Sequence, residues 1–224
     1  MEKIVDGVFT FTGLMMGRVY LTVDEDGLSL IDASIPPAAD KILEQLQKAG
    51  HQPADVKRIL ITHAHPDHVG AIPKLVEVTG AEVIVSEGER AALEGEIPIP
   101  SAPTMIKPPK TVLENMKADR VISYGDEIPE SLGGLVAFGT PGHAPGHTSF
   151  WQPDRKIIFV GDTIFNAPRL RLPYSFLTCD MAENIRSVKK IAELEPEVAC
   201  FGHGKPYVEG TAGILKRFAD RQRS

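Results

Sequence analysis

Four short apolar segments of this sequence are each followed by a loop that carries histidine or aspartate within its first few residues, and this arrangement constrains the fold more than any other feature. Apolar runs of this length between turn residues are typical of buried strands, and we predict such strands at 58–62, 135–138, 157–160 and 198–201. The loops after them carry most of the histidines of the chain. Polar ligand types on loops that are held by apolar strands are what a preorganised metal site requires.

The loop after the first of these strands reads His63-Ala64-His65-Pro66-Asp67-His68 and holds four potential ligands. One small cation cannot bind all four with good geometry while the backbone turns, so we expect two cations. His63 and His65 can reach one site from an extended backbone, whereas Asp67 and His68 follow the bend at Pro66 and point toward a neighbouring site. Imidazole and carboxylate suit zinc, and also iron or manganese. We expect two divalent metal ions, with zinc as the first choice.

The rest of the chain alternates strand and helix patterns, which indicates an α/β layer arrangement. Further strands are predicted at 8–12, 19–23, 28–31, 82–86 and 148–152. Helices are predicted at 37–49, 69–78, 87–93, 181–194 and 208–220. Five prolines in 97–109 exclude regular helix there and predict an extended surface segment. A length of 224 residues also permits two small units, but we expect one domain over 1–224.

Composition and charge argue against several classes of partner. The chain has 24 Lys and Arg against 30 Asp and Glu and no basic run, so we expect no nucleic-acid partner. The longest uncharged segment, 131–153, contains internal prolines and five glycines, so we expect no membrane span. Two cysteines form no disulfide framework, and charges near Met1 do not fit a signal peptide. We expect a cytoplasmic protein with a small-molecule substrate, and the sequence leaves the oligomeric state open.

Together with Gly146-His147, Gly161-Asp162 and Gly202-His203, the run His63–His68 resembles the metallo-β-lactamase superfamily over nearly the whole chain. The resemblance implies an α/β (α+β) fold, a four-layer αββα sandwich with a dinuclear site at one edge. It also implies the ligands, which are His63, His65 and His147 for the first metal, Asp67, His68 and His203 for the second, and Asp162 as a bridge between both. Because His143 precedes the matched ligand by four residues, we expect it to support a ligand or the fold.

Two adjacent cations bind a water between them and lower its pKa, while one of them polarises the substrate oxygen. We therefore expect a bridging hydroxide that hydrolyses an ester, thioester or lactone carbonyl. Asp67 or Asp162 is our hypothesis for the group that accepts the proton as the tetrahedral intermediate collapses. Asp32 follows a predicted strand, and it either orients a ligand histidine or caps a helix.

The subtype is less constrained by the sequence. Asp162 is similar to the bridging aspartate of glyoxalase II and lactonase relatives and unlike true β-lactamases, which disfavours antibiotic hydrolysis. Phe165 stands where lactonases often have tyrosine, and the basic C-terminal helical region of glyoxalase II is not evident. Arg169, Arg171 and Tyr174 are candidates to face the substrate, although a solvated loop explains the two arginines equally well. The alternative function is that of a mononuclear-iron persulfide dioxygenase, which shares much of the motif.

Overall fold

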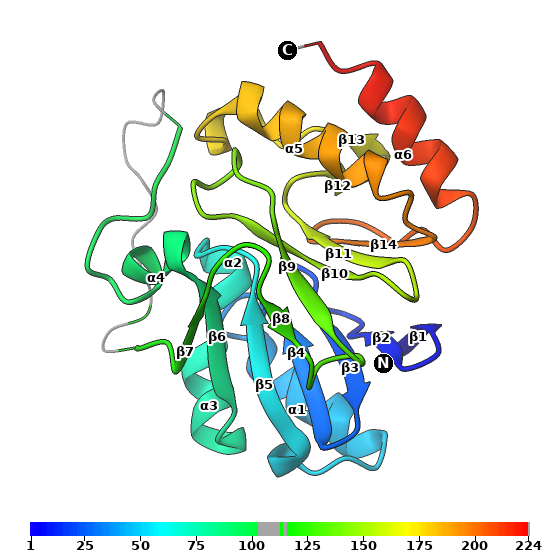
Figure 1. The fold of residues 1–224 in the computed structure, drawn as a ribbon. Coiled ribbons are helices and arrows are strands. Elements are labelled where there is room, and N and C mark those ends of the chain that lie inside the picture. The colour runs from blue at the N-terminus through cyan, green and yellow to red at the C-terminus, as the bar shows by residue number, and fades with distance from the viewer. Residues whose placement is uncertain (103–112, 114–115, 224) are drawn as a thin grey trace.

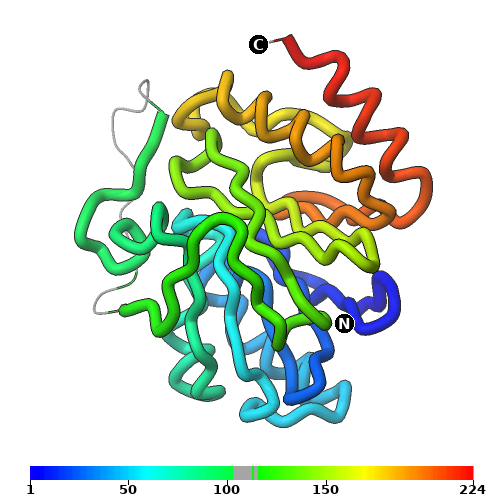
Figure 2. The backbone as a smooth tube through the Cα atoms, viewed as in Figure 1, coloured from blue at the N-terminus to red at the C-terminus, as the bar shows by residue number. Residues whose placement is uncertain are grey.

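The fold is a four-layer arrangement in which two β-sheets lie face to face and helices cover the outer face of each sheet (Figure 1). This computed structural model describes residues 1–102, 113 and 116–223. The backbone trace shows that the first half of the chain builds one side of the molecule and the second half builds the other (Figure 2). The αββα sandwich predicted from the sequence is confirmed by this architecture.

The first sheet has, among the described residues, seven strands in the order of the chain. They are β1 (Glu2–Val5), β2 (Val8–Thr10), β3 (Tyr20–Asp24), β4 (Gly27–Ile31), β5 (Val56–Ile61), β6 (Glu82–Ser86) and β7 (Arg120–Ile122). Strands β1 to β4 pair antiparallel, and β4 to β7 pair parallel. The parallel part needs helical crossovers, which α1 (Ala38–Lys48) and α3 (Ile72–Thr79) supply.

The second sheet has the strand order β14-β11-β10-β9-β8 within the described part of the chain. Its strands are β8 (Glu127–Ile128), β9 (Leu135–Gly139), β10 (Thr148–Gln152), β11 (Ile157–Gly161) and β14 (Val198–Phe201). Helices α5 (Met181–Glu193) and α6 (Thr211–Asp220) cover its outer face. A short β12 (Phe165–Asn166) and β13 (Leu170–Arg171) form a separate ribbon.

Three hydrophobic clusters hold these layers together, as apolar strands and amphipathic helices require. The cluster between the sheets includes Leu60 and Ile84 from the first sheet and Phe150 and Phe159 from the second. A second cluster packs α1 and α3 against the first sheet, and a third packs α5 and α6 against the second. Among the described residues, no helix combines the length and apolarity that crossing a membrane would require.

The predicted helix 69–78 is wrong in its bounds, because this segment forms two helices, α2 (Pro66–Val69) and α3. Gly70 lies between them and contacts Ile35 and Pro36 so closely that a side chain would overlap both residues. Gly70 is the C-cap residue of α2, and the close packing leaves no space for a side chain at this position. The proline-rich expectation for 97–109 lies partly outside the described residues, and 97–102 forms neither helix nor strand.

The two sheets meet at the ends of β5, β10, β11 and β14, and backbone hydrogen bonds join them there. Thr148 N–H at the start of β10 donates to the carbonyl of Thr62, just after β5, at 2.9 Å. Arg18 N–H, two residues before β3, donates to the carbonyl of Gly202, just after β14, at 2.8 Å. The loops that follow these strands are therefore brought to one edge of the sandwich.

Candidate metal centre

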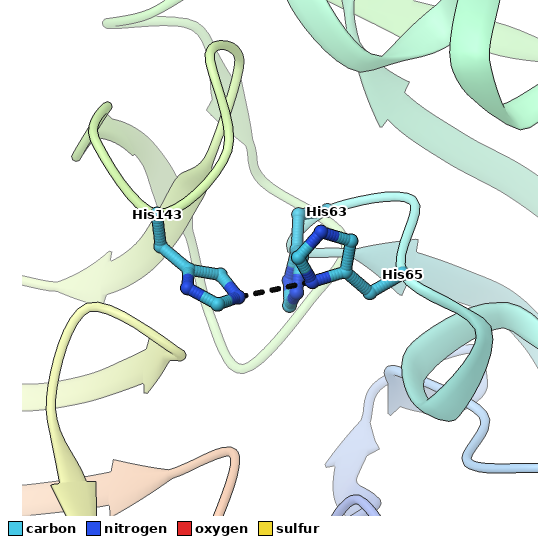
Figure 3. Close-up of side chains that lie close together, drawn as sticks. All are labelled: His63, His65 and His143. Carbon is cyan, nitrogen blue, oxygen red and sulfur yellow. Dashed lines mark hydrogen bonds between the residues drawn. The ribbon is translucent and has the colours of Figure 1, made fainter. Parts of the chain in front are cut away.

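Three groups of histidine and aspartate side chains lie at this edge of the sandwich. In each group, one ligand atom from every member lies within 4.8 Å of the others. The groups are His63, His65 and His143; His63, His68 and Asp162; and Asp67, His68 and His203. Figure 3 shows the first group, in which His143 Nε2 lies 3.0 Å from His65 Nδ1. Because the groups share members, they form one continuous cluster.

The backbone changes from extended to helical at Pro66, and this change separates His63 and His65 from Asp67 and His68. His65 has an extended backbone conformation and is the N-cap residue of α2, and Pro66 occupies the first turn, where a missing N–H costs nothing. His63 and His65 therefore precede the helix, whereas Asp67 and His68 lie on it. The groups follow the predicted division only in part, because His65 and Asp67 belong to different groups whereas His63 and His68 share the group that contains Asp162.

Asp162 occupies the centre of the cluster. Its Oδ2 lies 3.2 Å from His203 Nε2, 3.5 Å from His143 Nε2 and 4.0 Å from His63 Nε2. Its Oδ1 lies 3.2 Å from His68 Nε2. The carboxylate thus lies near histidines of all three groups.

Glycine is needed on both sides of this carboxylate. Gly161 has a φ of 58°, a left-handed conformation that favours glycine, and an added Cβ would contact the His147 ring. At Gly202, a Cβ would overlap Asp162 Oδ1 and crowd His68 Cε1. The Gly161-Asp162 and Gly202-His203 pairs are therefore explained by the close packing of the cluster.

Asp32 is hydrogen-bonded to one histidine of the cluster and orients its ring. His68 Nδ1 donates to Asp32 Oδ2 at 2.7 Å, and the backbone N–H of Thr62 donates to Asp32 Oδ1 at 2.9 Å. This bond fixes the ring so that Nε2 faces the other ligand atoms. Of the two roles that the sequence left open for Asp32, the structure shows the orientation of a histidine, because the N-cap residue of α1 is Pro37.

Several buried atoms of the cluster have no hydrogen-bond partner among the described residues. They are His63 Nε2, His68 Nε2 and Asp162 Oδ1. Unpaired buried polar atoms are costly, and native proteins rarely keep them without a reason. Imidazole nitrogens and a carboxylate oxygen that converge without protein partners are suited to divalent cations of the zinc type. The residues present therefore fit a metal centre.

The pKa values of the cluster are shifted in different directions for its carboxylates and for its individual histidines. Burial, followed by the charge of His68, holds the pKa of His63 well below its usual value, so its imidazole is neutral. Burial raises the pKa of Asp67, but His68 and His203 outweigh it and lower the pKa to about 2. The pKa of Asp162 is also well below its usual value, because the same two histidines outweigh its burial. Burial acts to lower the pKa of His68 and His203, but the neighbouring carboxylates outweigh it and raise the pKa of His203 to about 9 and that of His68 well above its usual value. These two imidazoles must therefore lose a proton to bind a cation, whereas the neutral His63 and the ionised carboxylates need not.

Comparison with known proteins places the chain in a family. The family model described as the metallo-beta-lactamase superfamily matches residues 12–203, which include every member of the three ligand groups.

The chain belongs to the metallo-β-lactamase superfamily.

Its similar relatives within the superfamily include proteins of different description. The uncharacterized protein YobT of Bacillus subtilis is 29% identical, over 87% of this chain and 86% of that protein. The probable metallo-hydrolase YflN of the same organism is 26% identical, over 84% of this chain and 79% of that protein. A hydroxyacylglutathione hydrolase of Fuscovulum blasticum is 30% identical over 81% of this chain, but only 58% of that protein is matched.

Solved structures of the superfamily share the fold. The metallo-beta-lactamase family protein TTHA1429 of Thermus thermophilus has a TM-score of 0.75 at 22% identity, covering 97% of this chain and 81% of that one. The subclass B3 metallo-beta-lactamase BJP-1 of Bradyrhizobium japonicum has a TM-score of 0.71 at 24% identity, covering 97% of this chain and 88% of that one. These likenesses establish the architecture of this superfamily member.

One histidine of the superfamily site differs from the sequence prediction. The structure groups His143, and not His147, with His63 and His65. His147 is fully buried, and its Nε2 accepts the backbone N–H of Asp162 at 3.0 Å. Its Nδ1 lies 2.8 Å from Thr140 Oγ1, so both ring nitrogens already have protein partners. His147 thus supports the backbone of Asp162, and His143 takes the position that the sequence prediction gave to His147.

A cavity of about 550 Å³ opens above the cluster of this superfamily member. One part of its wall consists of cluster side chains, namely His65, Asp67, His143, Asp162 and His203. The rest is mainly apolar, with Met16, Ile35, Phe165, Tyr174 and Leu177. The volume is in the usual range for small-molecule sites.

Of the three residues proposed from the sequence to face the substrate, only Tyr174 is among the described lining residues. Arg171 places its guanidinium 4.0 Å from the centre of the Tyr174 ring, outside the lining, and Arg169 is exposed. The arginines therefore contribute no charge to the described wall. Arg171 instead stacks on the outer face of a lining residue.

The unpaired ligand atoms lead to a prediction for folding stability. We expect zinc to raise the melting temperature of the metal-depleted protein, because cations bind the folded cluster and not the unfolded chain. At a free zinc concentration one hundred times the dissociation constant, one site adds about 2.7 kcal/mol to the free energy of unfolding. Differential scanning calorimetry with and without zinc measures the shift. An unchanged melting temperature in saturating zinc would contradict this expectation.

Proposed function

We propose that this chain is a dinuclear metal-dependent hydrolase that cleaves an ester, thioester or lactone carbonyl in a small molecule with an apolar acyl group. The observation that carries the proposal is the convergence of three ligand groups on Asp162 at the floor of a largely apolar cavity. In this proposal, His63, His65 and His143 hold one cation, Asp67, His68 and His203 hold the other, and Asp162 lies between the two. Zinc is our first choice of metal, because imidazoles dominate the donor set.

When bound, two such cations supply a water of lowered pKa and polarise a substrate oxygen. The protein contributes the placement of the substrate and the handling of protons. His203 and Asp67 face the cavity, and their Nε2 and Oδ2 atoms lie 3.2 Å apart. We propose Asp67 and Asp162 as the catalytic carboxylates, one of which accepts the hydroxyl proton of the tetrahedral intermediate as it collapses and passes it to the departing alkoxide or thiolate.

The cavity wall supports the choice of an apolar acyl group. Phe165 and Tyr174 contact each other edge to face, with ring centroids 6.3 Å apart, and both line the cavity. Met16 lines the cavity as well, and its side chain is 54% exposed and so is accessible to a ligand. The only charged groups of the described wall belong to the ligand cluster. An uncharged acyl chain can therefore enter without leaving an unpaired charge.

The experiment that tests this proposal is a comparison of p-nitrophenyl esters of increasing acyl length on the zinc-loaded enzyme. We expect kcat/KM to rise by at least about tenfold from acetyl to hexanoyl, because each buried methylene contributes up to about 0.8 kcal/mol. Met16→Ser is expected to lower kcat/KM for the hexanoyl ester by about three- to tenfold and to leave the acetyl ester within about twofold. Val208→Ser, which also removes an exposed apolar side chain but away from the cavity, serves as the matched control.

Two results count against the proposal. If the zinc-loaded enzyme turns over no ester, thioester or lactone of the series, the hydrolase assignment is refuted. Turnover that is independent of acyl length, with equal behaviour of the Met16 and Val208 variants, would keep the hydrolase and remove the apolar acyl group.

A further inference from the structure

Glu89 is a buried acid beside the metal centre that has no part in the proposed chemistry. It lies on the short helix α4 (Glu87–Leu93), and only 1% of its surface is exposed. Its Oε2 accepts the backbone N–H of Ala64 at 2.9 Å, and its Oε1 accepts the backbone N–H of Gly146 at 2.8 Å. Within the described part of the chain, these two N–H groups are the hydrogen-bond partners of the carboxylate.

The two partners of Glu89 lie in two different ligand loops. Ala64 stands between His63 and His65, and Gly146 lies in the loop that begins with His143. These three histidines form one ligand group, although the two loops are far apart in the sequence. A single carboxylate therefore connects the two halves of that group.

The backbone around Glu89 leaves little freedom for these loops to move. Gly88 and Gly146 pack backbone to backbone, so a Cβ on Gly146 would overlap the carbonyl carbon of Gly88. Ser86 Oγ donates to the carbonyl of Gly146 at 2.7 Å. The loop after His143 is consequently held against the start of α4 on both sides of Glu89.

Burial of Glu89 is costly for the fold. No Lys, Arg or His among the described residues lies within ion-pair distance of its carboxylate. Burial raises its pKa to about 7, although the two N–H groups act in the opposite direction. A neutral side chain of similar size would avoid this desolvation. Because burying this carboxylate is unfavourable, we expect Glu89 to have a role that needs two acceptor oxygens.

We propose that Glu89 is a positioning residue of the metal centre, which holds the loops of His63, His65 and His143 at a fixed separation before a cation binds. The inference rests on the proposed function only for the identity of the ligands. The proposed role concerns one ligand group alone, because the hydrogen bonds of Glu89 reach the loops of His63, His65 and His143. None of these bonds reaches Asp67, His68 or His203. Partners that orient ligands without touching the metal typically change metal affinity by about 10- to 100-fold.

The test is Glu89→Gln in the full chain, with zinc affinity measured by competition with a chromophoric chelator. Glutamine has nearly the same shape, but its NH₂ group must face one of the two backbone N–H donors. We expect the affinity for one of the two zinc ions to fall by about 10- to 100-fold, while the other stays within about threefold. We also expect a lower kcat at saturating zinc with KM within about twofold, because Glu89 does not line the described cavity.

The matched control is Asp24→Asn. Asp24 is likewise an acid with a buried side chain, and it accepts the backbone N–H of Leu132 at 2.8 Å, but it lies at the turn between β3 and β4. This variant is expected to lower the melting temperature and to leave both zinc affinities unchanged. If Glu89→Gln behaves in the same way, Glu89 serves the fold alone and the inference is overturned.

Two further results keep the inference separate from the proposed function. Should Glu89→Gln not fold, Glu89→Asp keeps the charge but is too short to reach both N–H groups. It must then show the selective loss of one zinc affinity, and wild-type affinity at both sites would overturn the inference.

Because zinc binding is measured without substrate, a wild-type enzyme that binds zinc and hydrolyses no ester would refute the proposed reaction and leave the role of Glu89 standing.

Discussion

Asp162→Ala is expected to lower kcat/KM for ester hydrolysis by more than about 100-fold, since even indirect partners of a metal change its binding by about 10- to 100-fold. The same variant should retain at most one metal per chain. The reason is geometric, because the Asp162 carboxylate approaches the ring nitrogens of His68, His143 and His203 within 3.5 Å. Removing it separates the ligand groups and leaves their histidines to repel one another when protonated.

Metal analysis and steady-state kinetics on the same preparation measure this effect. Asp126→Ala is a suitable control, because Asp126 is exposed and its side chain accepts the backbone N–H of Ser123 at a turn away from the cluster. That control should keep its metal and its activity. Full metal occupancy together with normal turnover in Asp162→Ala would refute the bridging position of this residue.

His143→Ala and His147→Gln are expected to differ sharply, although the two histidines stand in the same short motif. The first variant should lose one metal and at least about 100-fold in kcat/KM, because His143 Nε2 lies beside His65 and Asp162. His147→Gln keeps an acceptor for the Asp162 N–H and is expected to keep both metals at a lowered melting temperature. Metal content and calorimetry on both variants decide between them.

The reverse result would restore the assignment made from the sequence. If His147→Gln loses one metal while His143→Ala keeps two and remains active, His147 is the ligand and the observed grouping around His143 is not the functional one. Loss of metal in both variants with normal folding would instead indicate that each histidine binds.

The spacing of the motif explains why the sequence could not separate these two histidines. The residues read Pro-Gly-His-Ala-Pro-Gly-His, so each histidine follows the same dipeptide. In the fold, Thr140 N–H donates to the carbonyl of His147, which places His147 next to β10 and inside the sandwich. His143 lies at the far end of the intervening loop and reaches the cluster. The difference arises from the pairing of β9 with β10, which one sequence does not display.

The long strands and the larger helices could be predicted, because their apolar periodicity reflects burial. Strand β6 and helix α4 have the predicted bounds, whereas the short strands β1, β7, β8, β12 and β13 were not predicted. These strands have two to four residues and lack a continuous apolar run such as that of β14, so only their partner strands define them. The ligand run was predictable for a different reason, namely that so many ligand types in six residues would be costly to bury without a cation.

Glu89 was missed, although the sequence held a signal for it. Glu89, Ala92 and Leu93 have the spacing of one helical face, and all three are buried. A charged residue on the apolar face of a short helix is unusual. It can be recognised from the pattern, but its two backbone partners become known only when the ligand loops are folded against α4.

The most direct test of the central claim is the metal content and the hydrolytic activity of one preparation purified without added metal. We predict about two zinc or manganese ions per chain, measured by plasma mass spectrometry, together with turnover of a p-nitrophenyl ester, a thioester or a lactone. About one iron per chain without hydrolysis of any of these substrates would contradict the dinuclear hydrolase and favour a mononuclear-iron dioxygenase.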